Sequence, residues 1–90
     1  MTVEFDKSFE KWLSKISDKT LLGRIEKVIL KMESAESIDQ IQNVRTLAGF
    51  KRYYRGKLGN HRLGFERTSK SVIRLIIIAD RNEIYNKFPK

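Results

Sequence analysis

The N-terminal part of the chain carries apolar residues at the spacing of an α-helix. Four of them fall at i, i+3, i+4 and i+7 and form one stripe: Phe9, Trp12, Leu13 and Ile16. Asp6 precedes this stripe and suits an N-cap. After a break at Ser17, apolar residues continue with the same period to about Glu33, and Asp18 suits the cap of this second helix. Because the joint is so short, the two helices are predicted to form an antiparallel hairpin whose apolar stripes are core.

The C-terminal half switches to the pattern of β-strands. Three strands are predicted there, at residues 52–58, 61–67 and 72–79. They are separated by the two-residue Gly59-Asn60 turn and by a polar turn at 68–71. The last of the three is nearly all apolar and β-branched, which is typical of a central strand covered on both faces. Residues 2–5 also alternate and predict a short first strand.

This order of elements predicts an α+β fold. A short N-terminal strand and an antiparallel helical hairpin are expected to pack on a small, mostly antiparallel sheet of about four strands. Residues 34–49 are the least regular segment and suit a packed turn or a short helix. A short C-terminal helical turn begins near Asp80 and docks on the core through Ile84 and Phe88, which lie at i and i+4. Residues 1–90 are expected to form a single domain.

Composition excludes several kinds of site. The sequence of 90 residues contains no cysteine and one histidine. Disulfides, thiolate metal sites and cysteine nucleophiles are therefore excluded, a metal centre is not expected, and no cofactor is indicated. The longest apolar run, at 75–79, is far short of a membrane span, and the N-terminus does not resemble a signal peptide. We therefore expect a cytoplasmic protein without a membrane partner.

Charge is segregated along the chain, whose formal net charge is +8. Residues 1–42 carry seven Lys/Arg against eight Asp/Glu, whereas residues 43–90 carry twelve against three. Between Gln40 and Phe65 there is no acidic residue, and six basic ones accumulate: Arg45, Lys51, Arg52, Arg55, Lys57 and Arg62. Because they stand among aromatic residues on expected strands, we favour a surface that binds a polyanion over a merely basic, soluble surface.

Alternation along the strands sorts these residues by face. Three residues of the first basic strand share one face: Tyr53, Arg55 and Lys57. In the next strand Leu63 and Phe65 have the character of core residues, so Arg62 belongs to the opposite, open face. Gly64 on that open face would let a ligand approach the sheet. The alternative for Arg62 is an ion pair with Glu66 on the same face.

Two further residues project together after the last strand. Arg81 and Tyr85 lie at i and i+4, and they form either part of a site or a structural cation–π pair. With them, the order of motifs Arg55-Gly-Lys57-Leu58, His61-Arg62-Leu63-Gly-Phe65, apolar strand and Arg81-Asn-Glu-Ile84-Tyr85 resembles the RelE/ParE superfamily of bacterial toxins. The resemblance covers nearly the whole chain. It favours the RelE-type branch, whose members often end in a similar Arg-x-x-Ile-Tyr motif.

The resemblance implies an activity and a set of residues. Members of that branch cleave messenger RNA in the ribosomal A site without a metal, and a cognate antitoxin neutralises them. The positions that match their catalytic residues are Arg55, Lys57, Arg62, Arg81 and Tyr85. Four neighbouring residues are expected to bind RNA: Arg45, Lys51, Arg52 and Tyr53.

These residue types suit attack of an RNA 2′-hydroxyl on the adjacent phosphate. Arg62 and Arg81 carry permanently charged forks that can clamp the phosphate. Tyr85 can stack on a base or hold its hydroxyl near the reacting oxygens. Lys57 is the best candidate for the general base, because crowding by arginines favours its neutral amine.

Two positions depart from the family pattern. Arg55 stands where relatives often have lysine, and Asp80 stands where many have histidine. His61 neighbours Arg62, but its side chain is expected on the other face, where it suits a strand-end role. The leading hypothesis is a ribosome-dependent endoribonuclease toxin, favoured by the convergent basic set with Tyr85. The alternatives are a ParE-like protein that poisons DNA gyrase by binding, and an RNA-binding module or decayed toxin.

The same resemblance implies the partners of the protein. They are the ribosome, messenger RNA and a cognate antitoxin, with which the toxin would form a hetero-oligomeric complex. A basic surface invites an acidic, partly disordered antitoxin segment that would cover it and displace RNA.

Overall fold

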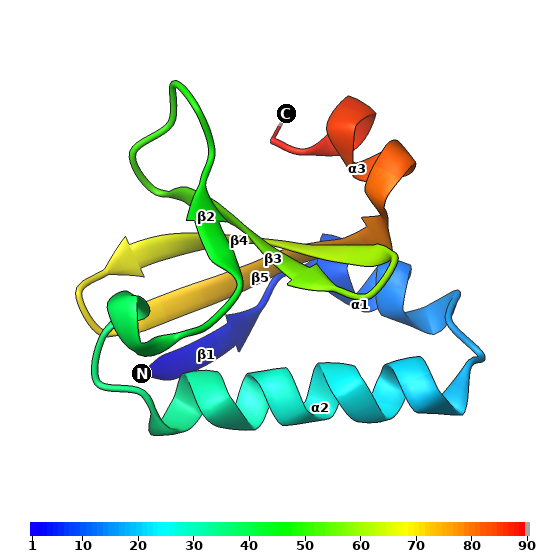
Figure 1. Ribbon diagram of the computed structural model, residues 1–90, viewed down its shortest axis with the longest axis horizontal. Helices are drawn as coiled ribbons and strands as arrows, with labels where there is room; N and C mark the ends of the chain where they lie inside the picture. The colour runs from blue at the N-terminus through cyan, green and yellow to red at the C-terminus, as the bar shows by residue number, and fades with distance from the viewer. Residues whose placement is uncertain (90) are drawn as a thin grey trace.

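The computed structural model describes residues 1–89 and contains one five-stranded sheet with helices on both sides (Figure 1). The strands are β1 (Thr2–Phe5), β2 (Val44–Thr46), β3 (Tyr53–Leu58), β4 (His61–Ser69) and β5 (Val72–Asp80). They lie in the order β1-β5-β4-β3-β2, and only the β1–β5 pair is parallel among the described strands. The helices are α1 (Lys7–Ser14), α2 (Lys19–Ser34) and α3 (Arg81–Lys87). In Figure 1, α1 and α2 lie below the sheet and α3 lies above it.

The α+β architecture is confirmed, and so are the predicted helix starts. Asp6 accepts a hydrogen bond from the backbone N–H of Ser8, and Asp18 accepts from those of Thr20 and Leu21. Each cap satisfies backbone donors that have no partner within the helix. The chain reverses direction between α1 and α2, and α2 runs along the lower edge of the molecule in Figure 1.

The irregular segment 34–49 contains more structure than a turn. It forms a 3₁₀-helix at Ile38–Gln40 and then the edge strand β2, so the sheet has one strand more than the expected four or so. β2 has three residues, which is too short for alternation to be recognised in the sequence. Its pairing with β3, in which Val44 lies opposite Gly56, defines it as a strand. β2 also carries Arg45 onto the sheet.

The main core lies between the helical hairpin and the sheet. Its largest fully buried side chains are Phe9, Phe65, Met32, Leu63, Ile73, Leu75 and Ile78. A second, smaller cluster lies under α3, where Ile77, Ala79, Ile84 and Phe88 pack together. A β-bulge in β5 lets Leu75 face the main core and Ile77 face the second cluster, because the register shifts from Gly64↔Ile77 to Phe65↔Leu75. The extra residue, Ile76, turns Ile77 away from the face of Leu75 and towards α3.

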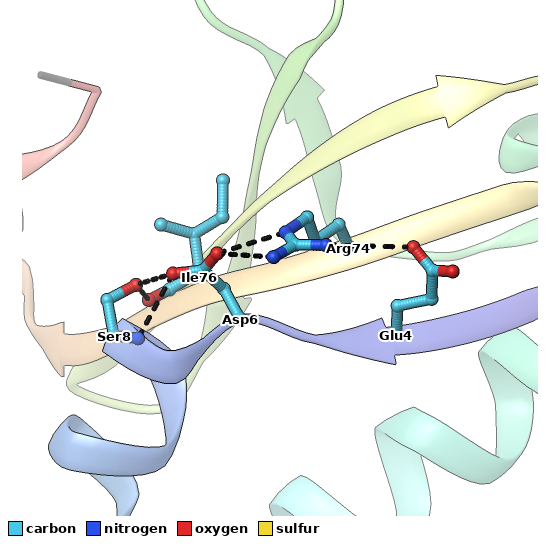
Figure 2. Close-up of polar contacts among 5 residues, drawn as sticks. All are labelled: Glu4, Asp6, Ser8, Arg74 and Ile76. Carbon is cyan, nitrogen blue, oxygen red and sulfur yellow. Dashed lines mark hydrogen bonds and ion pairs between the residues drawn. The ribbon is translucent and has the colours of Figure 1, made fainter.

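A polar cluster joins α1 and β1 to β5 (Figure 2). Arg74 Nη2 lies 2.7 Å from Asp6 Oδ1, and Arg74 Nη1 lies 3.9 Å from Glu4 Oε1. The Ser8 hydroxyl lies 2.6 Å from Asp6 Oδ2 and 2.7 Å from the Ile76 carbonyl oxygen, and its single hydrogen serves one of them at a time. The hydrogen bond from Ser8, followed by that from Arg74, lowers the pKa of Asp6 to about 2. We call these residues the Asp6–Arg74 cluster.

The N-terminal ammonium closes the far end of α2. It donates to the carbonyl oxygens of Met32, Glu33 and Ala35, at 3.2, 3.0 and 2.6 Å. A positive charge at a helix C-terminus is favourable because the carbonyl ends of the helix carry partial negative charge. Over residues 1–89, the helices are all too short or too polar to cross a membrane.

Candidate nucleic-acid interface

Basic side chains from three neighbouring strands meet on the sheet face that also carries α3. Arg45 lies opposite Arg55, and Lys57 lies opposite Arg62. Residues directly opposite in antiparallel strands share a face, with Cβ atoms about 4.5–5.5 Å apart. Like charges at that separation repel, so the arrangement costs stability and attracts an anion. We call Arg45, Arg55, Lys57 and Arg62 the basic face.

Tyr85 on α3 extends the basic face with an aromatic ring. The guanidinium carbon of Arg55 lies 4.5 Å from the centre of the Tyr85 ring. The tyrosine is nevertheless 66% exposed, so most of its surface is free to contact a ligand. The cation–π contact of Tyr85 is thus made with Arg55 of β3, whereas the sequence suggested Arg81 as the alternative partner. Arg55 orients a ring on which a base can stack.

Arg62 and Arg81 both adjoin the turn between β3 and β4. The Arg62 Nη1 atom donates to the carbonyl oxygens of Gly59 and His61, each at 2.8 Å. The backbone N–H of Arg81 donates to the carbonyl oxygen of Asn60 at 3.0 Å. The predicted turn is present, and glycine is suited to it because Gly59 has φ +62°. The turn therefore brings together two residues that are 19 positions apart in the sequence.

The alternative ion pair between Arg62 and Glu66 is wrong. Glu66 lies 3.6 Å from Arg52 instead. Glu66 is also opposite Arg74 of the Asp6–Arg74 cluster, so the acids of this face gather at one end of the sheet. The basic face at the other end is left without a carboxylate partner among the described ion pairs.

The remaining predicted RNA-binding residues lie outside the basic face. Arg52 lies at the acidic end of the sheet, where it pairs with Glu66. Lys51 is exposed in the segment before β3. Tyr53 shares the face of Arg55 but is half-buried, with edge-on contacts to Phe50 and Phe88 at 5.7 Å between ring centres. Tyr53 thus supports the docking of α3.

The prediction that Gly64 lets a ligand approach the sheet is wrong. A Cβ atom placed on Gly64 would lie 2.6 Å from Ile77 Cγ2 and 2.7 Å from Phe88 Cδ2. The space above the glycine is filled by α3, because Phe88 of the apolar cluster lies directly on it. Glycine is therefore required here so that α3, and with it Tyr85, can approach the sheet.

Asp80, one of the two positions that depart from the family pattern, has structural partners. The Asp80 carboxylate accepts hydrogen bonds from the backbone N–H groups of Asn82 and Glu83, at 2.9 and 2.8 Å, and caps α3. His61, the first residue of β4, is half-buried, and alternation directs its side chain away from the face of Arg62. Residues 1–89 contain no group of three or more His, Cys, Asp and Glu side chains that could hold a metal ion.

The surface contains a groove that was not predicted from the sequence. Arg24, Lys27 and Lys31 line a groove between α2 and the β2–β3 edge of the sheet. Their spacing of i, i+3 and i+7 places them on one side of a helix, and this signal was available in the sequence. The groove itself could not be expected, because its other wall includes the unpredicted strand β2.

The fold and the basic face define a class: a small α+β protein with clustered cations on one face of its sheet and an exposed tyrosine on the adjoining helix. No family model matches the chain. It is 29% identical to Toxin RelE3 of Methanocaldococcus jannaschii, over 99% of this chain and 100% of that protein. The toxin structure in the RelB–RelE antitoxin–toxin complex from Methanococcus jannaschii matches with a TM-score of 0.80 and 27% identity, covering 96% of this chain and 99% of that one.

A more distant structure shares the fold. The RelBE2 toxin–antitoxin complex from Mycobacterium tuberculosis matches with a TM-score of 0.68 and 15% identity, over 89% of this chain and 96% of that one. The similarity to Toxin RelE3 and to the M. jannaschii structure agrees with the order of motifs, whereas the M. tuberculosis structure shows the shared fold alone. Over nearly its whole length, the chain is therefore similar to toxins of the RelE type.

Proposed function

We propose that residues 1–90 form one toxin domain of a type II toxin–antitoxin pair, acting as a ribosome-dependent endoribonuclease. It cleaves messenger RNA in the ribosomal A site, needs no metal or cofactor, and arrests translation in the cytoplasm. The observation that carries this proposal is the basic face, in which Arg45 lies opposite Arg55 and Lys57 opposite Arg62. Such like-charge pairs are unfavourable in a sheet unless an anion neutralises them.

The reaction is a transesterification within the RNA. The 2′-oxygen forms a bond to the adjacent phosphorus and loses its proton, while the bond from phosphorus to the 5′-oxygen breaks. Lys57 is the proposed base that takes the proton, and the leaving 5′-oxygen gains a proton from the site or from water. The products are a 2′,3′-cyclic phosphate and a 5′-hydroxyl end, so atoms and charges balance.

Charge neutralisation is the main contribution of the protein to this reaction. The phosphorane carries more negative charge than the phosphate diester, and Arg62 and Arg81 are the proposed clamp for it. Arg55 adds a third guanidinium, held beside Tyr85 at 4.5 Å. Tyr85 stacks on a base and aligns the attacking oxygen with the leaving oxygen. Arg45, Lys51, Arg52 and Tyr53 are the proposed contacts to the flanking RNA.

The proposed partner is a cognate antitoxin that forms a hetero-oligomeric complex with the toxin. The relatives of known structure from M. jannaschii and M. tuberculosis are toxin–antitoxin complexes, which supports this partner. The chemistry of the surface supports it as well, because a basic face without paired acids favours an acidic segment.

The test is to map messenger RNA ends by primer extension in a cell-free translation reaction containing this protein. Parallel reactions contain or lack ribosomes. Cuts within codons that need ribosomes are expected. Cuts on naked RNA would instead establish a free ribonuclease, and the absence of cuts in both reactions would favour the gyrase-binding or RNA-binding alternatives.

A further inference from the structure

A second hollow of the described surface lies between α1 and the C-terminal end of α3. It is a pocket of about 330 Å³, and we call it the α1–α3 pocket. Ligand pockets in proteins begin at about 300 Å³, so this one suits a single planar ring system and is too small for a folded segment of another protein. Its lining includes residues from both helices and from the sheet: Trp12, Tyr53, Ile76, Ile77, Lys87 and Phe88.

The walls of the α1–α3 pocket are mainly apolar, and three of them are aromatic rings. Trp12 and Tyr53 are half-buried, and Phe88 is buried. The Tyr53 and Phe88 rings meet edge-on, with 5.7 Å between their centres. Phe88 in turn packs on Gly64, so this wall is fixed by the docking of α3. Rings that are held in place by packing favour a flat ligand that can stack on them.

The α1–α3 pocket has a cation but no acid among its described lining residues. Lys87 Nζ lies 5.8 Å from the centre of the Trp12 ring, near the limit of about 6 Å for a cation–π contact. Lys15 Nζ lies closer, at 4.6 Å, but Lys15 does not line the pocket. Lys87 takes part in none of the described ion pairs. Its ammonium group is therefore loosely held and free to turn towards an anion attached to a bound ring.

The α1–α3 pocket and the basic face flank the same helix. Tyr85 and Lys87 are two positions apart on α3, about 200° around a helix, so they project from opposite sides of it. Tyr53, which lines the pocket, is two residues before Arg55 on β3, about 7 Å along a strand. The two surfaces are therefore close enough for nearby nucleotides of one RNA strand.

We propose that the α1–α3 pocket binds one nucleotide of a single-stranded RNA, beside the nucleotides on the basic face, a proposal that rests on the proposed function in RNA cleavage. The base stacks on Trp12, and its phosphate binds Lys87. The Ser8 hydroxyl in the wall is already hydrogen-bonded to Asp6 or Ile76. Stacking therefore selects the base, and little preference among the four bases is expected.

The pocket acts on affinity and not on the reaction itself. The reacting phosphate lies on the basic face, whereas the pocket holds a nucleotide that does not react. Two sites on one strand bind it more tightly than either site alone, because the second contact forms within the complex. Loss of the pocket is therefore expected to raise KM for RNA and to leave kcat unchanged.

The test uses the fluorescence of Trp12, the only tryptophan of the sequence. The probe is a single-stranded RNA of about eight nucleotides, a typical length for a strand-binding site. Its 2′-oxygens are methylated, so it cannot undergo the proposed cleavage. Excitation at wavelengths that tyrosine does not absorb makes Trp12 the reporter of this pocket. The RNA is expected to quench Trp12 saturably, because a base stacks on its ring. RNA binding without quenching, or no RNA binding at all, would overturn the proposal.

A free mononucleotide distinguishes two sources of the same ligand chemistry. Adenosine 5′-monophosphate has a base and a phosphate but cannot reach the basic face at the same time. It is expected to quench Trp12 with at least about tenfold lower affinity than the RNA, because the strand adds contacts on the basic face. Equal affinities would show that the pocket takes a free nucleotide, and the assignment to RNA would be wrong.

Neutralisation of Lys87 separates the pocket from general basicity. The logarithm of the RNA binding constant falls with the logarithm of salt concentration, by about 0.7 per phosphate contact on a single strand. Lys87→Gln is expected to reduce this slope by about 0.7. The matched control Lys70→Gln removes the same charge from the turn between β4 and β5, outside the pocket, and should leave the slope unchanged. Equal changes in both variants, or no change in either, would contradict the proposal.

Replacement of Trp12 tests the stacking directly, with a fluorescein-labelled form of the RNA and anisotropy as the readout. Trp12→Leu is expected to weaken RNA binding by about 5- to 150-fold, the range for an aromatic ring under a stacked base. Trp12→Phe keeps a ring and should keep most of the affinity. Trp12 also packs against the cluster under α3, so urea unfolding checks that both variants fold. Lys87 is exposed, so the result with Lys87→Gln does not depend on this packing.

The outcome is separable from that of the proposed function, because the pocket is tested with an RNA that cannot be cleaved. Quenching that depends on Lys87, without any cleavage in the translation reaction, would refute the nuclease and leave the pocket assigned. Ribosome-dependent cleavage, together with quenching that is absent or insensitive to Lys87→Gln, would do the reverse.

Discussion

Two neighbouring surfaces of this protein flank α3, and they differ in the balance of charge and aromatic rings. The basic face has four cations beside one ring, that of Tyr85, whereas the α1–α3 pocket has three rings and one cation, Lys87. Clustered cations suit a reacting phosphate, because they stabilise the charge that develops on it. Rings suit a base, which carries no charge. Charge is therefore expected to determine where the chemistry occurs, and the aromatic rings are expected to determine how tightly the strand is held.

The helix α3 is the element that the two surfaces share. It carries Tyr85 beside the basic face and Lys87 beside the α1–α3 pocket, and Phe88, which directly follows it, packs on Gly64. A displacement of α3 is therefore expected to affect both surfaces together. The following experiments test the separation of the two surfaces, from the largest expected effect to the smallest.

The double variant Arg62→Ala and Arg81→Ala is expected to abolish detectable cleavage. Removing one preorganised donor to a transition-state oxyanion costs about 10²–10³ in rate, and two are removed here. Primer extension with ribosomes measures the loss, and Lys70→Gln is the control that keeps its activity. Wild-type cleavage by the double variant would show that neither arginine acts in the chemistry.

Replacement of Tyr85 separates stacking from the hydroxyl group. Tyr85→Ala is expected to weaken RNA binding by about 1–3 kcal/mol, as for other stacking aromatic residues. Tyr85→Phe keeps the ring over Arg55 and is expected to bind RNA as the wild type does. Anisotropy with a short RNA reports both, and quenching of Trp12 by the free mononucleotide should be unchanged in each. A loss of that quenching in Tyr85→Ala would mean that the two surfaces are not distinct.

Alanine substitutions at two glycines of the sheet, Gly64 and Gly56, test how tightly each surface is packed. A Cβ on Gly64 would lie 2.6 Å from Ile77 Cγ2, so Gly64→Ala is expected to destabilise the fold by about 1–3 kcal/mol and to displace α3. A Cβ on Gly56 would lie 3.7 Å from Val44 Cγ2, an ordinary contact, so Gly56→Ala is expected to be nearly neutral. Urea unfolding measures both.

A third glycine serves as the reference for these substitutions. Gly23 lies within α2 with nothing within 4 Å of an added Cβ, so Gly23→Ala is expected to stabilise by about 0.5–1 kcal/mol. If Gly64→Ala were as harmless as Gly56→Ala, the docking of α3 on Gly64 would be wrong.

At the end of the open face where the charges are paired, the expected effect is confined to low pH. The pKa of Asp6 is lowered from 3.8 to about 2 in the folded protein, so the unfolded chain binds more protons in that range. The stabilisation is complete above pH 3.8 and is lost as the pH falls towards about 2. Asp6→Asn keeps an N-cap but loses the charge opposite Arg74, and should flatten this dependence. Asp6→Ala also loses the cap, at a cost of about 0.5–2 kcal/mol. Acid titration of the unfolding free energy distinguishes the three proteins.

The sequence determined the elements whose signals are local. Helix caps at Asp6 and Asp18 and the Gly59-Asn60 turn were predicted because each depends on residues close together in the chain. Alternation likewise placed Arg55 and Lys57 on one face of their strand and Arg62 on the open face of the next strand, and the pairing of Lys57 with Arg62 shows that these are the same face of the sheet. The order of motifs indicated the resemblance to RelE-type toxins, and the similarity to Toxin RelE3 supports it.

Only the tertiary structure decided what depends on contacts between distant segments. The strand β2 exists because it pairs with β3, and the groove lined by Arg24, Lys27 and Lys31 exists because β2 stands opposite α2. Asp6 and Arg74 meet across 68 positions, and no pattern in the sequence joins them. The role of Gly64 was predicted wrongly for the same reason. The side chain that fills the space above it is that of Phe88, which directly follows α3. Local periodicity fixes which face a residue occupies, whereas packing fixes what it meets there.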